Sequence, residues 1–362
     1  MFLGFGEIMA RIAPPDHLRW QQAVPGRVEV TWGGGEANVC ASLAMFGESA
    51  RYLTALPRNS ISQSLANTMR GVGVDTSQIY WRDEGRLGVY FVEVGTNQRG
   101  STVLYDRSYS AISLAAPEEY NFDAALSGVT HVHITGITPA ISENACRSNL
   151  ELIKRAKVSG ATVSCDLNYR KKLWNWRDGT PKQQLARECM SQVLPHVDLV
   201  IANEEDAAMV LDIHAEGTDV EGGQINAAAY ERVAREVVHQ FPNVSRVAIT
   251  LRESLSADHN NWGALLFDKS EDRAYLAPLD SDGRYQPYEI RDIVDRVGAG
   301  DSFAAGLLHA LNTDDNGHPE KAIQFAVAAS CLKHSVKGDF NYVTHEEAAT
   351  LAAGNATGRV QR

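Results

Sequence analysis

The chain lacks the long hydrophobic runs and paired cysteines that would place it in a membrane or in an oxidising compartment. No apolar stretch approaches the roughly 18 residues that a transmembrane helix needs. The five cysteines are odd in number, widely spaced and without a C-x-x-C pair, so we expect free thiols in a reducing cytoplasm. The apolar start, MFLGFGEIM, has no basic segment before it and contains Glu7, which favours a first strand over a signal peptide.

An excess of positive charge is also missing. The 362 residues carry 34 Lys and Arg against 45 Asp and Glu, which gives a formal net charge of −11. This balance argues against a general binder of nucleic acid or of an anionic membrane, although one small anion site remains compatible with it. With 44% hydrophobic residues the chain can bury a substantial core, either as one large domain or as two smaller ones.

Short aliphatic or β-branched runs alternate with helix-like segments along the chain. Strands are predicted near residues 2–9, 131–134, 162–166, 199–202 and 247–251. The helices predicted from apolar residues at intervals of three and four are 37–46, 143–159, 182–194, 227–240, 302–312 and 319–334. This alternation predicts an α/β fold with a mostly parallel sheet covered by helices.

Residues 88–107 interrupt the alternation. Two strand-like runs flank a turn rich in Gly and Asn, which predicts a hairpin. With the extended segment 24–32 it is expected to form a small β-sheet lid, and a surface hairpin without function is the alternative. The expected division is an α/β core at 1–12, 33–86 and 112–350, a lid at 13–32 and 87–111, and a tail at 351–362. Residues 215–224 are expected to form a surface insertion.

The most informative motif is DRVGAGD at residues 295–301. Gly298 and Gly300 directly precede a predicted helix, so backbone N–H groups are left free at its N-terminus, where they can bind an anion. Asp301 lies in the first turn and can accept a proton from a hydroxyl beside that anion, which is what a phosphoryl acceptor site requires. A tight turn with Asp301 as a helix cap is the alternative. The dinucleotide fingerprint is incomplete, and the sequence contains no P-loop motif.

Three motifs in order, GGGEAN (33–38), NEED (203–206) and DRVGAGD, resemble those of the ribokinase-like (PfkB) sugar kinases. The resemblance runs from about residue 1 to residue 350. Within that family the chain is most similar to 2-keto-3-deoxygluconate kinases, through YDRSYSA (105–111) and CDLNYRKKLW (165–174) as well. The resemblance implies a three-layer α/β/α core with a β lid. It also implies transfer of a phosphoryl group from ATP, with Mg²⁺, to the C6 hydroxyl of the sugar acid, and it leaves a monovalent cation open.

The resemblance also implies roles for individual residues. Asp301 would be the catalytic base, and Gly298, Ala299 and Gly300 would stabilise charge on the transferring group. The residues expected to bind the sugar acid are Gly34, Glu36, Asn38, Tyr90, Tyr105, Arg107, Arg170 and Asp295. Those expected to border ATP are Asn203, Arg252, Ser254, Gly298, Gly300, Lys337 and Gly338, with Asp206 and Glu205 holding the metal indirectly.

Two arginines support a sugar acid on chemical grounds. A planar guanidinium binds a carboxylate in a paired geometry, so a kinase for a sugar acid should place arginine where a kinase for a neutral sugar need not. Arg107 in the lid and Arg170 after a core strand are the candidates, and solvated surface charge is the alternative. The competing functions are a kinase for fructose, ribose or tagatose, and a catalytically silent sugar or nucleotide sensor on the same fold.

Three features depart from the family pattern. The motif that is usually N-x-x-E ends here in Asp206, with Glu204 or Glu205 as substitutes. Arg296 stands where Thr is common, and residues 250–263 replace a short Gly-containing turn, so the nucleotide pocket should differ locally. The hairpin edge of the lid would be unprotected in a monomer, which favours a homodimer through the lid.

Overall fold

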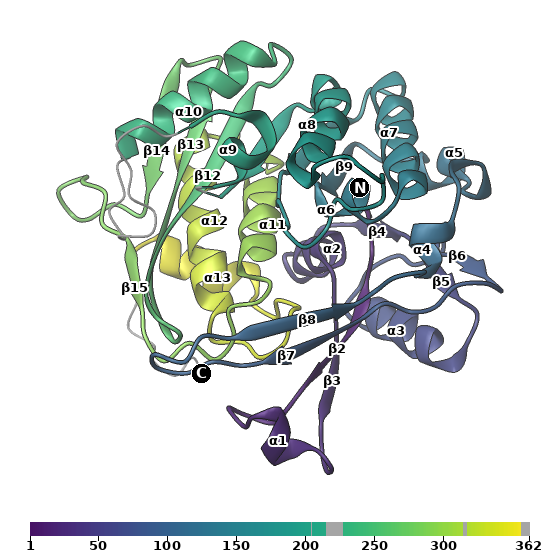
Figure 1. Cartoon of the computed structure of the whole chain (residues 1–362). Coiled ribbons are helices and arrows are strands. Elements are labelled where there is room, and N and C mark those ends of the chain that lie inside the picture. Colours follow the sequence, from purple (N-terminus) through teal and green to yellow (C-terminus); the bar gives the residue numbers. More distant parts are fainter. Residues whose placement is uncertain (204, 215–226, 314–316, 356–362) are drawn as a thin grey trace.

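The computed structural model describes residues 1–203, 205–214, 227–313 and 317–355 (Figure 1). The expected insertion at 215–224, Glu204 and most of the tail lie outside the described residues. All five cysteines are free. None of the helices described is both long enough and apolar enough to cross a membrane.

The core is a nine-stranded sheet in the order β14-β13-β12-β11-β10-β9-β1-β4, with β15 pairing with β13. Neighbours from β4 to β12 run parallel, whereas β13 pairs antiparallel with β12, β14 and β15. The strands are β1 (Phe2–Phe5), β4 (Ala50–Leu53), β9 (His131–Thr135), β10 (Thr162–Asp166), β11 (Leu199–Ala202), β12 (Arg246–Ser256), β13 (His259–Asp268), β14 (Arg273–Ala277) and β15 (Tyr288–Ile290). The predicted α/β architecture is confirmed.

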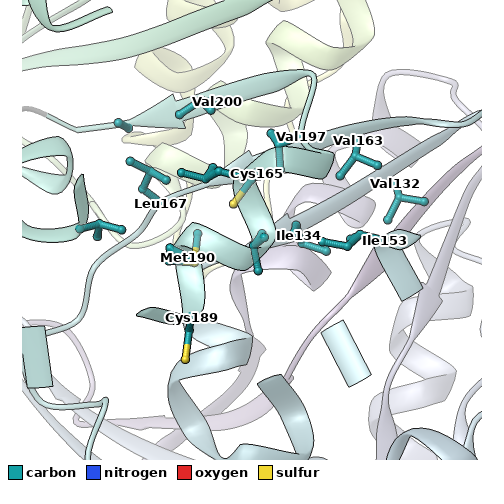
Figure 2. Packing of buried hydrophobic residues seen from close by; sticks show 14 of the residues in the cluster. Val132, Ile134, Ile153, Val163, Cys165, Leu167, Cys189, Met190, Val197 and Val200 are labelled. Atoms are coloured by element: carbon teal, nitrogen blue, oxygen red, sulfur yellow. The ribbon is translucent and has the colours of Figure 1, made fainter. Parts of the chain in front are cut away.

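Helices cover both faces of this sheet, and each layer has its own hydrophobic cluster. One layer contains α5 (Phe122–Leu126), α7 (Glu143–Val158), α8 (Lys182–Val193), α9 (Asp206–Leu211) and α10 (Ala227–Gln240). The other contains α2 (Gly35–Met45), α3 (Ser60–Gly71), α11 (Ala299–Leu311), α12 (Pro319–Lys333) and α13 (His345–Ala352). Figure 2 shows part of the first cluster, with Val163 and Val200 of the sheet and Met190 of α8 among its labelled members. On β11, Leu199 and Ile201 belong instead to the second cluster, as alternation along a strand requires.

A separate four-stranded sheet in the order β3-β2-β7-β8 forms the lid. Its strands are β2 (Met9–Ala13), β3 (Glu29–Gly33), β7 (Val89–Glu93) and β8 (Thr102–Asp106), and α1 (Trp20–Ala23) lies at its outer end (Figure 1). The hairpin is confirmed, with Tyr90 opposite Tyr105. The expected core boundary at residue 12 is too late, because β2 begins at Met9 and is already part of the lid. The remaining short elements are β5 (Ala55–Pro57), β6 (Tyr80–Arg82), α4 (Ala111–Leu114) and α6 (Ile137–Ile141).

Strands β12 and β13 form a hairpin whose tip reaches the lid. The strand predicted at 247–251 continues to Ser256, and Ser256 pairs with His259 across the turn. At the tip, the Ala257 N–H donates to the carbonyl of Asn97 at 2.7 Å. Asp258 Oδ2 accepts from Thr96 Oγ1 at 3.0 Å and from the Asn97 N–H at 2.9 Å. Residues 250–263 are therefore a long β-hairpin that contacts the lid.

Candidate active site

A cavity of about 460 Å³ lies between the lid and the carboxyl ends of β10, β11 and β12. Ligands usually bind at this edge of an α/β sheet. The expected residues that line it are Gly34, Asn38, Tyr90, Tyr105, Arg107, Arg170, Asn203, Asp206, Arg252, Gly298, Ala299, Gly300 and Asp301. The expected residues that do not line it, although all are described, are Glu36, Ser254, Glu205, Asp295, Lys337 and Gly338.

The N-terminus of α11 has the geometry that the predicted anion hole requires. Gly298 is its N-cap with φ +84°, and a Cβ there would overlap the backbone carbonyl of Asp339, so only glycine fits. The helix begins at Ala299, which places Gly300 and Asp301 in its first turn. Helix geometry leaves the first N–H groups without intrahelical acceptors. A Cβ at Gly300 would meet no atom within 4 Å, so this part of the turn is open.

Asp301 is oriented by a residue from the first motif. Asn38 Nδ2 donates to Asp301 Oδ2 at 2.6 Å, while Asn38 Oδ1 accepts the Gly34 N–H at 3.2 Å. Burial raises the pKa of Asp301 to about 6, and the hydrogen bond from Asn38 opposes that rise. A carboxylate with a pKa near neutrality is suited to accept a proton from a hydroxyl.

The two expected sugar-acid arginines differ in their surroundings. Arg107 is buried and paired with Glu7, and its Nε donates to Glu7 Oε2 at 2.6 Å. The Arg170 guanidinium is exposed in the cavity wall and makes no hydrogen bond or ion pair with a described residue. Of the two, Arg170 is therefore the one without a direct ion pair, although its charge opposes the rise in pKa that burial causes at Asp166, Asp206 and Asp301. Tyr90 and Tyr105 also line the cavity, and their rings stack with centres 5.9 Å apart.

Two expected sugar ligands have their carboxylates occupied elsewhere. Glu36 Oε1 accepts from the Thr135 N–H at 3.1 Å, from Thr135 Oγ1 at 2.7 Å and from Thr138 Oγ1 at 2.8 Å. Burial raises the pKa of Glu36 to about 7. Asp295 is 3% exposed and pairs with Arg11 at 2.7 Å. Contrary to the expectation from the resemblance, both carboxylates brace the fold behind the cavity wall.

The residues expected to border ATP also fall into two groups, those that line the cavity and those that do not. Arg252 lines the cavity, but Ser254 lies farther along β12. Lys337 pairs with Glu29 of β3 at 2.5 Å, and the Gly338 N–H donates to Asp295 Oδ2 at 3.1 Å, so the two residues fix their loop.

Arg296, the departure from Thr, lines the cavity and holds the β12–β13 hairpin. Its Nη2 donates to the carbonyls of Ser256 at 3.1 Å and Ala257 at 2.5 Å. A third contact, at 3.3 Å, is to Asn260 Oδ1. Two of the three departures noted in the sequence, Arg296 and the long 250–263 segment, therefore belong to one contact.

A family model described as pfkB family carbohydrate kinase matches residues 3–344. The chain belongs to this family. A 2-dehydro-3-deoxygalactonokinase of Haloferax volcanii is 30% identical over 355 residues, which cover 98% of this chain and 97% of that protein. The crystal structure of a 2-dehydro-3-deoxygluconokinase from Thermotoga maritima is 41% identical with a TM-score of 0.87, covering 98% of this chain and 99% of the other. An Escherichia coli putative ribokinase II in complex with ATP and Mg²⁺ shares the fold at 17% identity and TM-score 0.72, covering 98% and 99%.

The oxygen donors of this PfkB kinase fit Mg²⁺. Asp166 and Asp206 line the cavity at the ends of β10 and β11, and Asn168 Oδ1 beside them is buried without a hydrogen-bond partner. Within the described ranges, no group of three or more His, Cys, Asp and Glu side chains could hold a metal by itself. Mg²⁺ is commonly held by one or two carboxylates together with phosphate oxygens, which matches this set.

The NEED motif of the PfkB kinase serves mainly as a helix start. Asn203 Oδ1 accepts the Glu205 N–H at 2.8 Å and the Asp206 N–H at 3.0 Å. Asp206 in turn accepts the N–H groups of Tyr169 at 2.9 Å and Asn203 at 3.1 Å. Glu205 is exposed and contributes only its backbone to these contacts, so Asp206 and Asp166 are better placed than Glu205 to face a metal.

Sequence reasoning gave no role to several polar residues in or directly behind this site. Asp166 and Asn168 were quoted only as part of a motif, and Glu7 only as a charge inside an apolar run. Arg11 was not singled out at all. A buried charge within a strand was the available signal for Glu7 and Arg11, because such a charge needs a partner.

Proposed function

We propose that this PfkB kinase transfers the γ-phosphoryl group of ATP to the C6 hydroxyl of 2-keto-3-deoxy-D-gluconate, giving the 6-phosphate and ADP. The observation that carries the proposal is the Arg170 guanidinium, which makes no direct ion pair in the cavity that also holds Asp301 and the N-terminus of α11. A sugar carboxylate would supply a direct partner. The names of the Haloferax and Thermotoga relatives support a 2-keto-3-deoxy sugar acid, and they differ in the epimer at C4.

Each group of the site has a part in this reaction. Asp301 accepts the proton of the attacking hydroxyl, and Asn38 holds its carboxylate in position. The first-turn N–H groups of α11 stabilise the charge of the phosphoryl group in flight. Asp166 and Asp206 would hold Mg²⁺ together with the nucleotide, and the ion would supply positive charge to neutralise the polyphosphate. The lid, carrying Tyr90 and Tyr105, excludes water as a competing acceptor.

One observation favours a neutral sugar as the second candidate. The Glu7–Arg107 pair is already neutral and buried, and Glu7 Oε1 has no hydrogen-bond partner, so it can accept a sugar hydroxyl. A kinase for fructose, ribose or tagatose would use this end of the cavity and leave Arg170 to solvent. A silent sensor is the weakest reading, because the base, its orienting amide and the anion hole are all in place.

We also propose a homodimer formed through the outer face of the lid. Val30, Ile12, Phe91 and Leu104 lie in register across all four lid strands. Val30 is 55% and Leu104 64% exposed. A contiguous exposed apolar row on a sheet is typical of an interaction surface. The free thiols fit a cytoplasmic protein, and the acidic balance fits one without nucleic-acid or membrane partners.

An ADP-release assay tests the function. The acceptors are 2-keto-3-deoxygluconate, its C4 epimer, a carboxyl-reduced analogue, fructose, ribose, tagatose and a blank without acceptor. We expect turnover with the two sugar acids only, and ³¹P–¹³C coupling in the product at C6. Faster turnover with a neutral sugar than with either acid would overturn the proposed substrate, and ADP release in the blank alone would overturn the transfer to a sugar.

A further inference from the structure

A lid residue, Arg11, reaches the back of the anion hole. Its Nη2 lies 2.7 Å from Asp295 Oδ2, and its Nη1 donates to Asp339 Oδ1 at 2.8 Å. All three side chains are at most 4% exposed. A guanidinium with two separate carboxylate partners fixes both in position, because its donors have a rigid planar geometry.

The two carboxylates lie on either side of the catalytic turn. Asp295 Oδ1 accepts the Val297 N–H at 3.1 Å, directly before Gly298. The backbone carbonyl of Asp339 packs against Gly298 so closely that no Cβ fits between them. The guanidinium of Arg11 therefore connects the residue that starts the turn with the residue that supports it from behind.

The same arginine also connects the turn to the acceptor side of the cavity. Asp339 lines the cavity, and its Oδ2 accepts the hydroxyl of Tyr90, whose ring forms part of the lid wall. Gly33 provides the space for this contact, because a Cβ there would overlap Asp339 Oδ2. Arg11 and Tyr90 thus hold Asp339 from two neighbouring lid strands, where they are register partners.

Two buried carboxylates this close require a counter-charge. Lys333 is also buried, but its Nζ donates to the carbonyl of Val336 at 3.0 Å. Of the cationic side chains that the structure describes, Arg11 alone makes ion pairs with both Asp295 and Asp339. Burial raises the pKa of Asp339, and Arg11 is the first influence that lowers it again. Without Arg11 one carboxylate would have to bind a proton or move towards water.

We propose that Arg11 is a positioning residue for phosphoryl transfer, which holds the Gly298 turn in its working geometry from the lid through Asp295 and Asp339. The inference rests on the proposed phosphoryl transfer but not on the identity of the sugar. Arg11 does not line the cavity, so its loss should change turnover more than the affinity for ATP or sugar.

The test compares Arg11→Met with Arg51→Met. Arg51 is the matched control, since its Nε donates to Asp75 at 2.7 Å and its Nη1 to the Ala125 carbonyl at 2.8 Å, in a partly buried pair away from the cavity. Arg11→Met should lower kcat about 10²-fold, the usual result of a small displacement in a catalytic site, with little change in either KM. Arg51→Met should lower the melting temperature and leave kcat nearly unchanged.

Rescue separates positioning from folding. Guanidinium ions should restore part of the kcat of Arg11→Met by occupying the vacated space, whereas urea, which has a similar shape and no charge, should not. Arg11→Lys, which keeps the charge, should retain more activity than Arg11→Met and serves if the latter does not fold. A folded Arg11→Met with normal kcat, or a kcat loss that guanidinium does not relieve and that Arg51→Met shares, would overturn the inference. Each variant's kcat is compared with the parent's kcat for whichever acceptor the parent enzyme phosphorylates. An error in the proposed substrate would change the choice of acceptor, whereas an error in the role of Arg11 would change these ratios.

Discussion

Asp301 owes its chemistry to a neighbour from the other end of the chain. Its carboxylate is partly buried, which raises its pKa to about 6, and Asn38 of α2 donates the hydrogen bond that limits the rise. A base must be deprotonated before it can accept a proton. Activity should therefore be lost as the pH falls through about 6 and should be level above it.

Asp301→Asn should bind ATP and sugar but turn over about 10²–10⁴-fold more slowly, the usual contribution of a positioned base. Its residual kcat/KM should lack the inflection near pH 6 that is expected for the parent.

Asn38→Ala, which removes the hydrogen bond favouring the carboxylate of Asp301, should move the inflection of kcat/KM to higher pH. Steady-state kinetics between pH 5 and 9 measure all three, and a pH profile shared by Asp301→Asn and the parent would exclude Asp301 as the titrating group.

The two arginines of the sugar end should behave differently when replaced. Arg170→Ala should weaken binding of the sugar acid far more than binding of its carboxyl-reduced analogue, because its guanidinium makes no hydrogen bond or ion pair with a described side chain. Arg107→Ala leaves Glu7 buried without its partner, which typically costs about 3–5 kcal/mol of folding free energy. Calorimetric titration measures the binding of acid and analogue to Arg170→Ala, and thermal melts measure the stability of Arg107→Ala. Equal losses for acid and analogue in Arg170→Ala would remove the carboxylate argument.

At this scale the sequence was informative where a backbone motif carries the chemistry. DRVGAGD predicted the Gly-rich turn and the helix start at Ala299, because such a turn before a helix has few other arrangements, and the anion hole and base assigned to it stay predictions. The motif could not indicate that Arg11 forms an ion pair with Asp295, or that Glu7 forms one with Arg107. These partners are far apart in sequence, and a side chain's counter-ion is decided only when the sheets pack together.

Among the elements, the β12–β13 hairpin contacts the lid through hydrogen bonds at its tip. Asp258 at its tip accepts hydrogen bonds from the Ser256 hydroxyl, the Asn97 N–H and the Thr96 hydroxyl, and these lower the pKa of Asp258 to about 2. The contact should therefore persist throughout the physiological pH range. Arg296 holds the same tip from the catalytic motif, so the lid hairpin and the anion hole share one support.

Asp258→Ala should loosen the lid without unfolding the core, because Asp258 lies at a half-buried hairpin tip and belongs to neither hydrophobic cluster of the core. We expect faster hydrogen exchange at the Asn97 amide, a higher KM for the sugar and more ATP hydrolysis without acceptor, since water can then enter. Exchange mass spectrometry and the ADP-release blank measure these effects. His259→Ala at the same tip is the control, and an exchange rate at Asn97 unchanged from the parent would show that the contact does not hold the lid.

The sequence predicted the positions of several helices and strands accurately, and the ends of some strands less accurately. β10, β11 and α10 agree with the sequence prediction residue for residue, because aliphatic runs and amphipathic spacing determine them locally. The ends of β12 and the start of β2 were wrong, since polar residues there are stabilised by a partner strand rather than by their own pattern. Strand pairing is a non-local property that no single segment encodes.

At the scale of the whole molecule, the outer face of the lid predicts the oligomeric state. Leu104→Lys should convert a dimer into a monomer, because it places a charge in the exposed apolar row that contains Val30. The substitution lies on the face opposite Tyr105 and should leave the melting temperature of the core unchanged. Sedimentation velocity at several concentrations measures the state, with Thr102→Lys as the control at the end of the same strand. A parent protein that is monomeric at micromolar concentration would contradict the proposal.

The Arg11–Asp339 ion pair joins residues 328 positions apart in the chain. During synthesis the ribosome must release nearly all of the protein before the arginine emerging first can meet its carboxylate. Until then the Gly298 turn has no support from behind, and a partly made chain has no working anion hole. Contacts of such long range close late, after local helices and neighbouring strands have formed. A nascent or truncated kinase that ends before Asp339 therefore has its lid strands but lacks the ion pair that supports the Gly298 turn.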